Sequence, residues 1–103
     1  MKAGPAPRWS VYVVRCRDGA LYTGIATDVR RRLRQHRAGK GAKALRGRGP
    51  LRLLLARAVG DRGVAQVVEA AIKRLRKAQK ERLLAAPRRL LLHFAAAALD
   101  ARA

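Results

Sequence analysis

The sequence is short of carboxylates, aromatic side chains and cysteine. Only six of its 103 residues are Asp or Glu, and it contains no Asn. Its four aromatic residues are Trp9, Tyr12, Tyr22 and Phe94, so the core is expected to consist of Val, Leu, Ile and Ala. The single cysteine, Cys16, excludes an internal disulfide and a zinc site built from several cysteines.

Long apolar segments are also missing. Residues 1–8 lack the apolar stretch of a signal peptide. The longest nearly apolar run, residues 90–99, has about half the length that spans a bilayer. We therefore expect a cytoplasmic protein without a membrane partner.

The positive charge is extreme. Lys and Arg number 25, and the formal net charge is +19. Such a chain repels itself unless a polyanion neutralises it, and the phosphate backbone of nucleic acid is the obvious candidate. A GC-rich genome would explain why Arg is used more than Lys, but it would not explain the shortage of carboxylates. We expect a nucleic-acid partner, DNA rather than RNA, and a monomeric protein.

The pattern of apolar residues predicts three strands and at least two helices. Runs rich in β-branched and apolar residues predict strands at residues 9–17, 21–26 and 51–59. Helical spacing predicts helices at 29–38 and 62–76, with a break near 77–79 before another short helix. The order β-β-α-β-α predicts an α+β fold with a three-stranded, mostly antiparallel sheet flanked by helices.

The length allows one domain. We expect a flexible N-terminal arm at residues 1–8, a folded domain at 9–84 and a helical C-terminal tail at 85–103.

The first predicted helix carries polar residues on its apolar face. Val29, Arg32, Leu33 and His36 follow the spacing i, i+3, i+4, i+7 and share one side. The other arginines of this segment turn outward: Arg30, Arg31 and Arg34. An inward Arg could stabilise charge on a phosphate, and a His could accept a proton. The alternatives are an Arg stem along the edge of the core and a buried, hydrogen-bonded His.

Glu69 is a rare carboxylate within the second predicted helix, at the edge of its apolar stripe. Mg²⁺ is commonly held by one or two carboxylates together with waters and substrate phosphates, so one Glu can suffice. The alternative is a solvent-facing Glu that pairs with Lys73 at i+4.

The two tyrosines, ten residues apart, fall on the first two predicted strands. A two-residue loop at Asp18-Gly19 would place them on opposite faces, whereas a three-residue loop, Asp18-Gly19-Ala20, would place both on one face. Phenols near a metal could help to deprotonate water, although cross-strand aromatic pairs are common in hairpins. Gly24 would permit close approach of the backbone or a bulge.

A basic loop rich in glycine follows at residues 39–50, GKGAKALRGRGP. It lacks the ending and the context of a nucleotide P-loop. We expect either a flexible clamp for nucleic acid or simply a solvated loop. The cations of the expected clamp are Lys40, Lys43, Arg46 and Arg48.

These residues together resemble the GIY-YIG nuclease superfamily. The residues that carry the resemblance are VYV at 11–13, YTG at 22–24, Arg32 and His36 on one helix and Glu69 on a later helix. The run GKGAKALRG further resembles the small stand-alone bacterial branch. The resemblance covers residues 9 to about 84.

The resemblance implies an endonuclease that uses Mg²⁺ or Mn²⁺ to cleave phosphodiesters in DNA processing or repair. Glu69 would hold the metal, Arg32 would stabilise the charge on phosphate, and Tyr12 or Tyr22 with His36 would handle the proton. Together with the spacing, the resemblance predicts that these five side chains line one concave patch. It favours the three-residue hairpin loop, which puts both tyrosines on one face. Many family members also carry an active-site Asn, which this chain does not have. Two other interpretations stay open, a catalytically idle nucleic-acid-binding module of the same fold and a basic structural protein.

Overall fold

The computed structural model describes residues 7–85. The expected tail beyond residue 85 and most of the expected N-terminal arm lie outside this range. The described chain forms β1 (Trp9–Arg15), β2 (Leu21–Ala26), α1 (Val29–Arg37), a short 3-10 helix (Lys43–Leu45), β3 (Arg52–Gly60), α2 (Arg62–Lys73) and α3 (Lys77–Ala85). Among residues 7–85, no helix is long and apolar enough to cross a bilayer.

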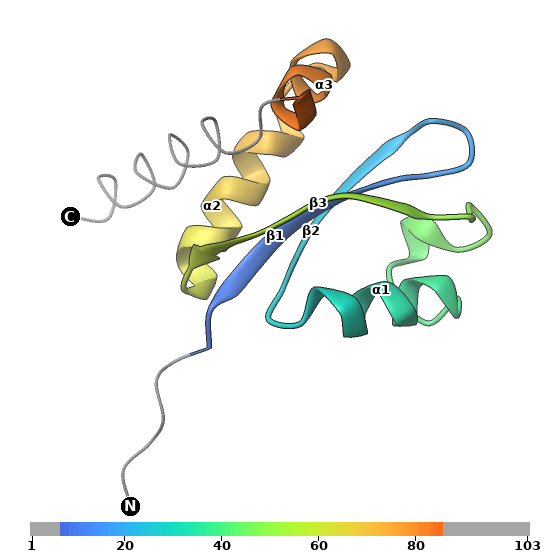
Figure 1. Ribbon diagram of the computed structural model, residues 1–103, viewed down its shortest axis with the longest axis horizontal. Coiled ribbons are helices and arrows are strands. Elements are labelled where there is room, and N and C mark those ends of the chain that lie inside the picture. The colour runs from blue at the N-terminus through green and yellow to red at the C-terminus, as the bar shows by residue number, and fades with distance from the viewer. Residues whose placement is uncertain (1–6, 86–103) are drawn as a thin grey trace, which may run out of the picture.

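The three strands form one antiparallel sheet in the order β2-β1-β3. β1 is central, and its alternate side chains face the two sides of the sheet. Figure 1 shows α1 on one side of the sheet and α2 with α3 on the other. The α+β prediction, with an antiparallel three-stranded sheet between helices, is confirmed.

The hairpin loop between β1 and β2 sets the register. Cys16 pairs with Ala20 through a backbone hydrogen bond of 2.8 Å, so the loop consists of Arg17, Asp18 and Gly19. Gly19 adopts φ of 87°, a conformation that favours glycine. The loop thus has three residues but lies one position earlier than Asp18-Gly19-Ala20. Its consequence is the same, because Tyr22 opposite Val14 shares a face with Tyr12 opposite Gly24.

Aspartates cap the two helices that follow strands β2 and β3. Asp28 accepts a hydrogen bond from the backbone N–H of Arg31, and Asp61 accepts one from that of Val64. The predicted face of α1 is confirmed, with Leu33 and His36 buried and Arg32 half-buried. The arginines expected to turn outward are exposed, namely Arg30, Arg31 and Arg34.

Helix α2 ends at Lys73, three residues before the predicted end. After this end, the Oε1 of Gln79 accepts the backbone N–H of Arg76 at 2.9 Å, the contact of a capping box at the start of α3. The break therefore occurs at residues 74–76 rather than at 77–79.

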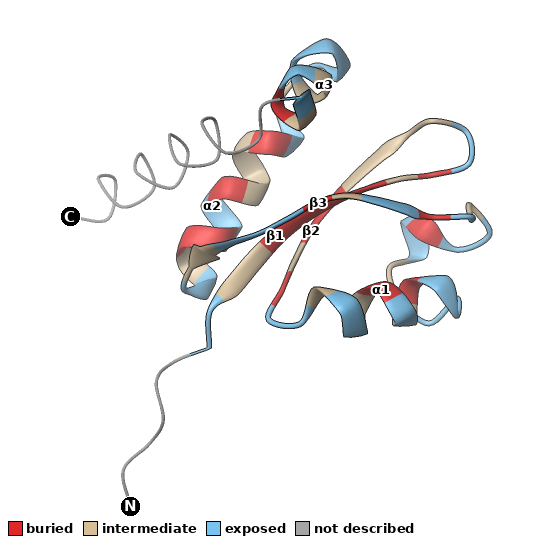
Figure 2. Cartoon of the chain, in the orientation of Figure 1, coloured by how far each residue is buried: buried red, intermediate tan, exposed pale blue. Residues whose placement is uncertain are grey.

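Two separate buried clusters lie on the two faces of the sheet. The hydrophobic cluster on the α2 face is aliphatic, and Thr23, opposite Val13, is a buried polar residue on the same face. The buried members of the cluster are Val11, Val13, Leu55, Val64, Val68, Ile72 and Leu83. The α1 face combines apolar residues with Tyr12 and His36; its apolar members are Val14, Cys16, Ala26, Leu33, Leu45 and Leu51. Figure 2 shows buried residues along β1 and β2 and repeatedly along α2. Of the candidates for chemistry, Tyr12, Tyr22, Arg32 and His36 therefore belong to the α1 side, whereas Glu69 belongs to α2.

Candidate active site

Tyr12 and His36 make the central contact of the α1 face. The Tyr12 Oη lies 2.7 Å from His36 Nε2, and both residues are buried. β1 supplies the tyrosine and α1 the histidine, so the hydrogen bond joins the sheet to the helix. Residues 24 positions apart in the sequence meet here because the predicted face of α1 packs against the strand.

The basic loop fixes the protonation of His36. The backbone N–H of Ala42 donates to His36 Nδ1 at 3.2 Å. Since Nδ1 accepts this bond, the neutral ring carries its proton on Nε2 and donates it to Tyr12. Burial, followed by the charge of Arg32, lowers the pKa of His36 and favours this neutral form. In this form His36 donates to Tyr12, and its contacts match the buried, hydrogen-bonded His that the sequence left open.

Two glycines allow these close contacts. A Cβ at Gly41 would collide with the His36 ring, and a Cβ at Gly24 would collide with the Tyr12 ring and hydroxyl. Glycine at these positions lets the backbone lie directly against each side chain. Gly24 thus has the close-approach geometry considered from the sequence.

Tyr22 completes a group of three rings. Its ring centroid lies 6.4 Å from that of Tyr12 and 5.8 Å from that of His36, the second pair in an edge-to-face arrangement. Both distances fall within the range of favourable aromatic pairs. Tyr22 is half-buried, whereas Tyr12 is only 1% exposed. Of the two phenols, Tyr22 is therefore the more accessible to solvent.

Arg32 lies beside this cluster on α1. It is half-buried, and its Nη1 donates to Gln35 Oε1 at 3.0 Å. Its guanidinium also acts on Tyr12, where it lowers the pKa and so favours the ionised phenol. Burial is nevertheless the largest influence and, together with the neighbouring Tyr22, raises the pKa of Tyr12 to about 12.

Glu69 comes from α2, on the other side of the sheet from α1 (Figure 1). Its charge still contributes to raising the pKa of Tyr12. Its side chain is 23% exposed, and Oε2 lies 3.7 Å from Lys73 Nζ. Glu69 is thus half-buried and within electrostatic reach of Tyr12, and it also makes the pair with Lys73 that the sequence left open.

The carboxylate of Glu69 could hold Mg²⁺ only together with ligands from outside the described residues. Residues 7–85 contain no group of three or more His, Cys, Asp or Glu side chains that could hold a metal. A single accessible carboxylate is compatible with Mg²⁺ when waters and substrate phosphates complete the shell. Glu69 fits that role, with Lys73 as a competitor for the same carboxylate.

The four loop cations divide into two kinds. Lys40, Lys43 and Arg46 are exposed. Arg48 Nη2 lies 2.7 Å from Asp18 Oδ2, and this contact adds to the Ala20 amide in lowering the pKa of Asp18. Arg48 therefore ties the loop to the hairpin.

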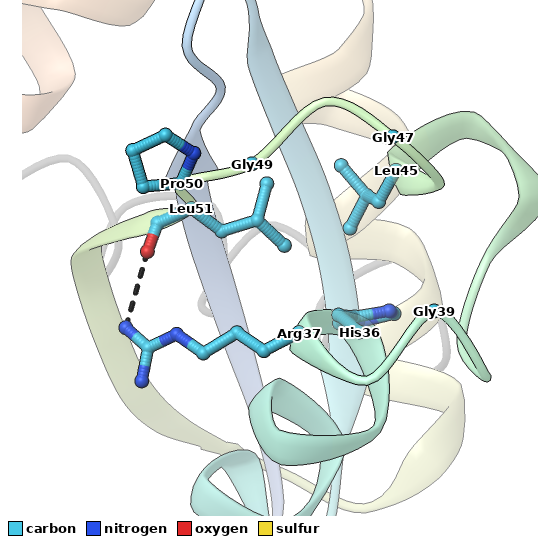
Figure 3. Close-up of a pocket in the computed structure, with 8 residues that line it drawn as sticks. All are labelled: His36, Arg37, Gly39, Leu45, Gly47, Gly49, Pro50 and Leu51. Carbon is cyan, nitrogen blue, oxygen red and sulfur yellow. Dashed lines mark hydrogen bonds between the residues drawn. The ribbon is translucent and has the colours of Figure 1, made fainter.

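The basic loop is held against the α1 face at Leu45. Leu45 is 2% exposed and belongs to the α1-face cluster. A hollow of about 560 Å³ lies between this loop and the end of α1, and Figure 3 shows its lining residues, with Arg37 Nη2 donating to the Leu51 carbonyl oxygen at 3.1 Å. His36 borders this hollow, whereas the tyrosines do not. The sequence missed the contact from Ala42 to His36, and the only sign of it was Gly41 within GKGAKAL.

This arrangement can be compared with known proteins. A family model described as the GIY-YIG catalytic domain matches residues 8–82. The chain belongs to the GIY-YIG family. The resemblance found in the sequence is thereby confirmed, and with it a nuclease-type family whose substrate is nucleic acid.

Two relatives are named as UPF0213 proteins. The UPF0213 protein YhbQ of Salmonella typhimurium is 60% identical over 76 residues, which cover 74% of this chain and 76% of the relative. A UPF0213 protein of Aeromonas hydrophila is 54% identical over 87 residues, which cover 84% of this chain. The match spans 64% of the Aeromonas protein, slightly less than two thirds of its length.

A solved structure is similar as well. The solution NMR structure of a UPF0213 protein from Bacillus halodurans aligns with a TM-score of 0.51 at 44% sequence identity. The alignment covers 76% of this chain and 83% of the other. Sequence and fold thus agree on the family.

Proposed function

We propose that this protein is a divalent-metal-dependent endonuclease that hydrolyses phosphodiester bonds in DNA, during DNA processing or repair. It would act in the cytoplasm as a monomer. The observation that carries the proposal is the chain of contacts from Ala42 through His36 to Tyr12, next to Arg32. Such an arrangement costs burial of polar groups, which an ordinary core avoids.

Tyr12 and His36 serve as positioning residues in this proposal. Tyr12 is too deeply buried for an attacking water to reach it. Its oxygen accepts from His36 and is held next to Arg32, so the α1 face presents a fixed set of donors. A preorganised site of this kind needs little rearrangement when charge develops on a phosphate.

Tyr22 is the phenol that can meet the attacking water, because it is only half-buried at the edge of the three rings. In our proposal Tyr22 helps to deprotonate the attacking water, and Arg32 donates hydrogen bonds to the phosphate oxygens as negative charge builds up. Glu69 would hold the Mg²⁺ or Mn²⁺, which supplies positive charge for the phosphate and for ionisation of nearby groups.

The test uses the full chain with branched, nicked and single-stranded DNA, with Mg²⁺, with Mn²⁺ and without metal; matching RNA substrates define the sugar preference. Glu69→Gln removes the metal-holding charge with little change in shape. The matched control is Glu81→Gln, which removes a helical carboxylate that pairs with Arg15 at 2.7 Å, outside the three-ring cluster. We expect on the order of a hundredfold loss of cleavage for Glu69→Gln only.

Cleavage that survives Glu69→Gln would show that the activity comes from a contaminant or from another site. The second candidate function is an idle nucleic-acid-binding module. The contact of Lys73 with Glu69 favours it, because this pair gives the carboxylate a structural role without metal. Wild-type protein that binds DNA but cuts no substrate with either metal would establish this second candidate.

A further inference from the structure

A second hollow, of about 410 Å³, lies where β1 and α2 begin and where β2 leads into α1 (Figure 1). Its walls include the side chains of Trp9 and Ile25 and three arginines, Arg31, Arg32 and Arg62. This volume falls within the range of about 300–1,000 Å³ that is usual for small-molecule sites. The hollow can therefore take a ligand the size of a nucleotide.

Trp9 is the only tryptophan of the chain. It is half-buried and belongs to neither buried cluster of the described residues. The guanidinium of Arg62 lies over its ring, 5.5 Å from the centroid. An indole with a guanidinium on one face is a flat, cationic platform, and both groups stack well on nucleobases.

The charge of the hollow selects an anionic ligand. Its three arginines face one carboxylate, Asp28, whose oxygen already accepts the backbone N–H of Arg31 at 3.0 Å. Excess positive charge beside an aromatic wall fits a nucleotide, which has an anionic phosphate and a flat base. An acidic peptide would satisfy the charge but would leave the Trp9 ring without a stacking partner.

Arg32 connects this hollow to the active site. It lines the hollow together with Gln35, to which it donates a hydrogen bond, and its charge also acts on Tyr12. A phosphate held by Arg32 would therefore place its neighbouring nucleoside at the entrance of the hollow. In a duplex that base is paired and stacked inside the helix, so only an unpaired or extruded base can reach Trp9.

We propose that the hollow lined by Trp9, Arg62 and Arg32 is a subsite for an unpaired nucleobase, so that the preferred substrate carries a single-stranded nucleotide beside the scissile phosphate. This inference rests on the proposed function, because it places the scissile phosphate at Arg32. It adds a substrate class, namely single strands, flaps, gaps and branch points, to the general statement that the protein acts on nucleic acid.

The test uses the fluorescence of Trp9 in the full-length wild-type chain without divalent metal, so that nothing is cleaved. The titrants are a single-stranded oligonucleotide, its duplex and an abasic strand of equal phosphate count, all labelled for anisotropy. We expect strong quenching of Trp9 emission by the single strand and little by the other two. Equal quenching by all three would overturn the base subsite, and failure of all three to bind would overturn the proposed function itself.

Variants separate stacking from charge. Trp9→Leu should weaken single-strand binding roughly tenfold or more, as expected for loss of one base–aromatic stack, and leave duplex and abasic affinity unchanged. Arg62→Ala should weaken the single strand more than Arg74→Ala, an exposed arginine at the other end of the same helix. A Trp9→Leu protein that loses affinity equally for all three titrants would contradict stacking. The wild-type quenching decides the matter if that variant fails to fold.

Discussion

The two faces of the sheet share the same three strands and differ in what they bury. On the α2 face, β1 places Val11 and Val13 against Val68 and Ile72, and the cluster is purely aliphatic. On the α1 face, β1 places Tyr12 under His36, and a loop amide is needed to satisfy the imidazole. An aliphatic cluster tolerates small shifts, whereas a buried polar group must keep its partners. The interior of the α2 face is therefore suited to stability, and the α1 face holds most of the candidates for chemistry, with Glu69 added from α2.

The largest expected effect breaks the α2 face. Ile72 is 1% exposed within the aliphatic cluster. Ile72→Ala should lower the free energy of unfolding by about 2–5 kcal/mol, and the control Ile72→Val by about 0.5–1.5 kcal/mol, measured by denaturant titration. The fraction of Ile72→Ala that remains folded should cleave or bind nucleic acid normally. A loss of activity at full folding would mean that the two faces are coupled.

The second effect breaks the α1 face without breaking the fold. Arg32→Ala removes a half-buried guanidinium beside Tyr12, and Arg34→Ala removes an exposed one from the same helix. Both variants have the same net charge. We expect cleavage to fall on the order of a hundredfold for Arg32→Ala and by much less for Arg34→Ala, with DNA binding retained in both. Equal losses of cleavage in the two variants would show that Arg32 acts only through its positive charge, as any arginine of the helix does.

The sequence predicted those features of each face that depend on neighbouring residues, and not those that depend on contacts between distant segments. The position of Arg32 and His36 on one face of α1 was predicted correctly, because helical periodicity is local. The shared face of Tyr12 and Tyr22 depended on the length of the hairpin loop. The residues alone left two lengths open, the resemblance favoured three, and the register has three.

The contact from Ala42 to His36 was not predicted. It depends on how a loop folds back against its helix, and no periodicity encodes that. Glu69 was expected to line one patch with the other four candidates, but it lies on α2, on the other side of the sheet from α1 (Figure 1), because the sequence does not show on which side a later helix packs. The faces on which polar side chains lie could thus be predicted from local pattern, but their partners could not.

A third, smaller effect is the pH dependence of stability, which should come from His36 on the α1 face and not from the α2 face. The pKa of folded His36 is lowered from 6.5 by burial and by Arg32. As the pH falls below about 6.5, the unfolded chain therefore binds a proton that folded His36 resists, and the free energy of unfolding decreases. This decrease stops once the pH has passed below the folded pKa as well.

Thermal unfolding between neutral and mildly acid pH measures this effect. His36→Gln removes the imidazole, so the variant should lose less stability over the same pH range than the wild type. Ile72→Val, on the other face, should keep the wild-type pH dependence. Identical slopes for wild type and His36→Gln would show that groups other than His36 cause the acid sensitivity.

The smallest expected effect is a change in the salt dependence of DNA binding. It tests which positively charged surface contacts the phosphate backbone. Lys40, Lys43 and Arg46 are exposed on the loop of the α1 face, whereas Arg48 pairs with Asp18 and is left in place. Changing these three residues to Ala lowers the net charge from +19 to +16 (19 − 3 = 16). The slope of log K against log salt for duplex DNA should flatten by up to about 2.7, or about 0.9 for each phosphate that the variant no longer neutralises.

The matched control removes three exposed cations from the opposite side, namely Arg74, Lys77 and Arg82. It has the same net charge, so a protein that binds DNA only through its overall charge would show the same flattening with either triple variant. A local interface on the α1 face instead predicts flattening with the loop variant and a nearly unchanged slope with the control. Because both variants leave every buried residue in place, the difference between the two slopes reports which face of the sheet meets the phosphate backbone.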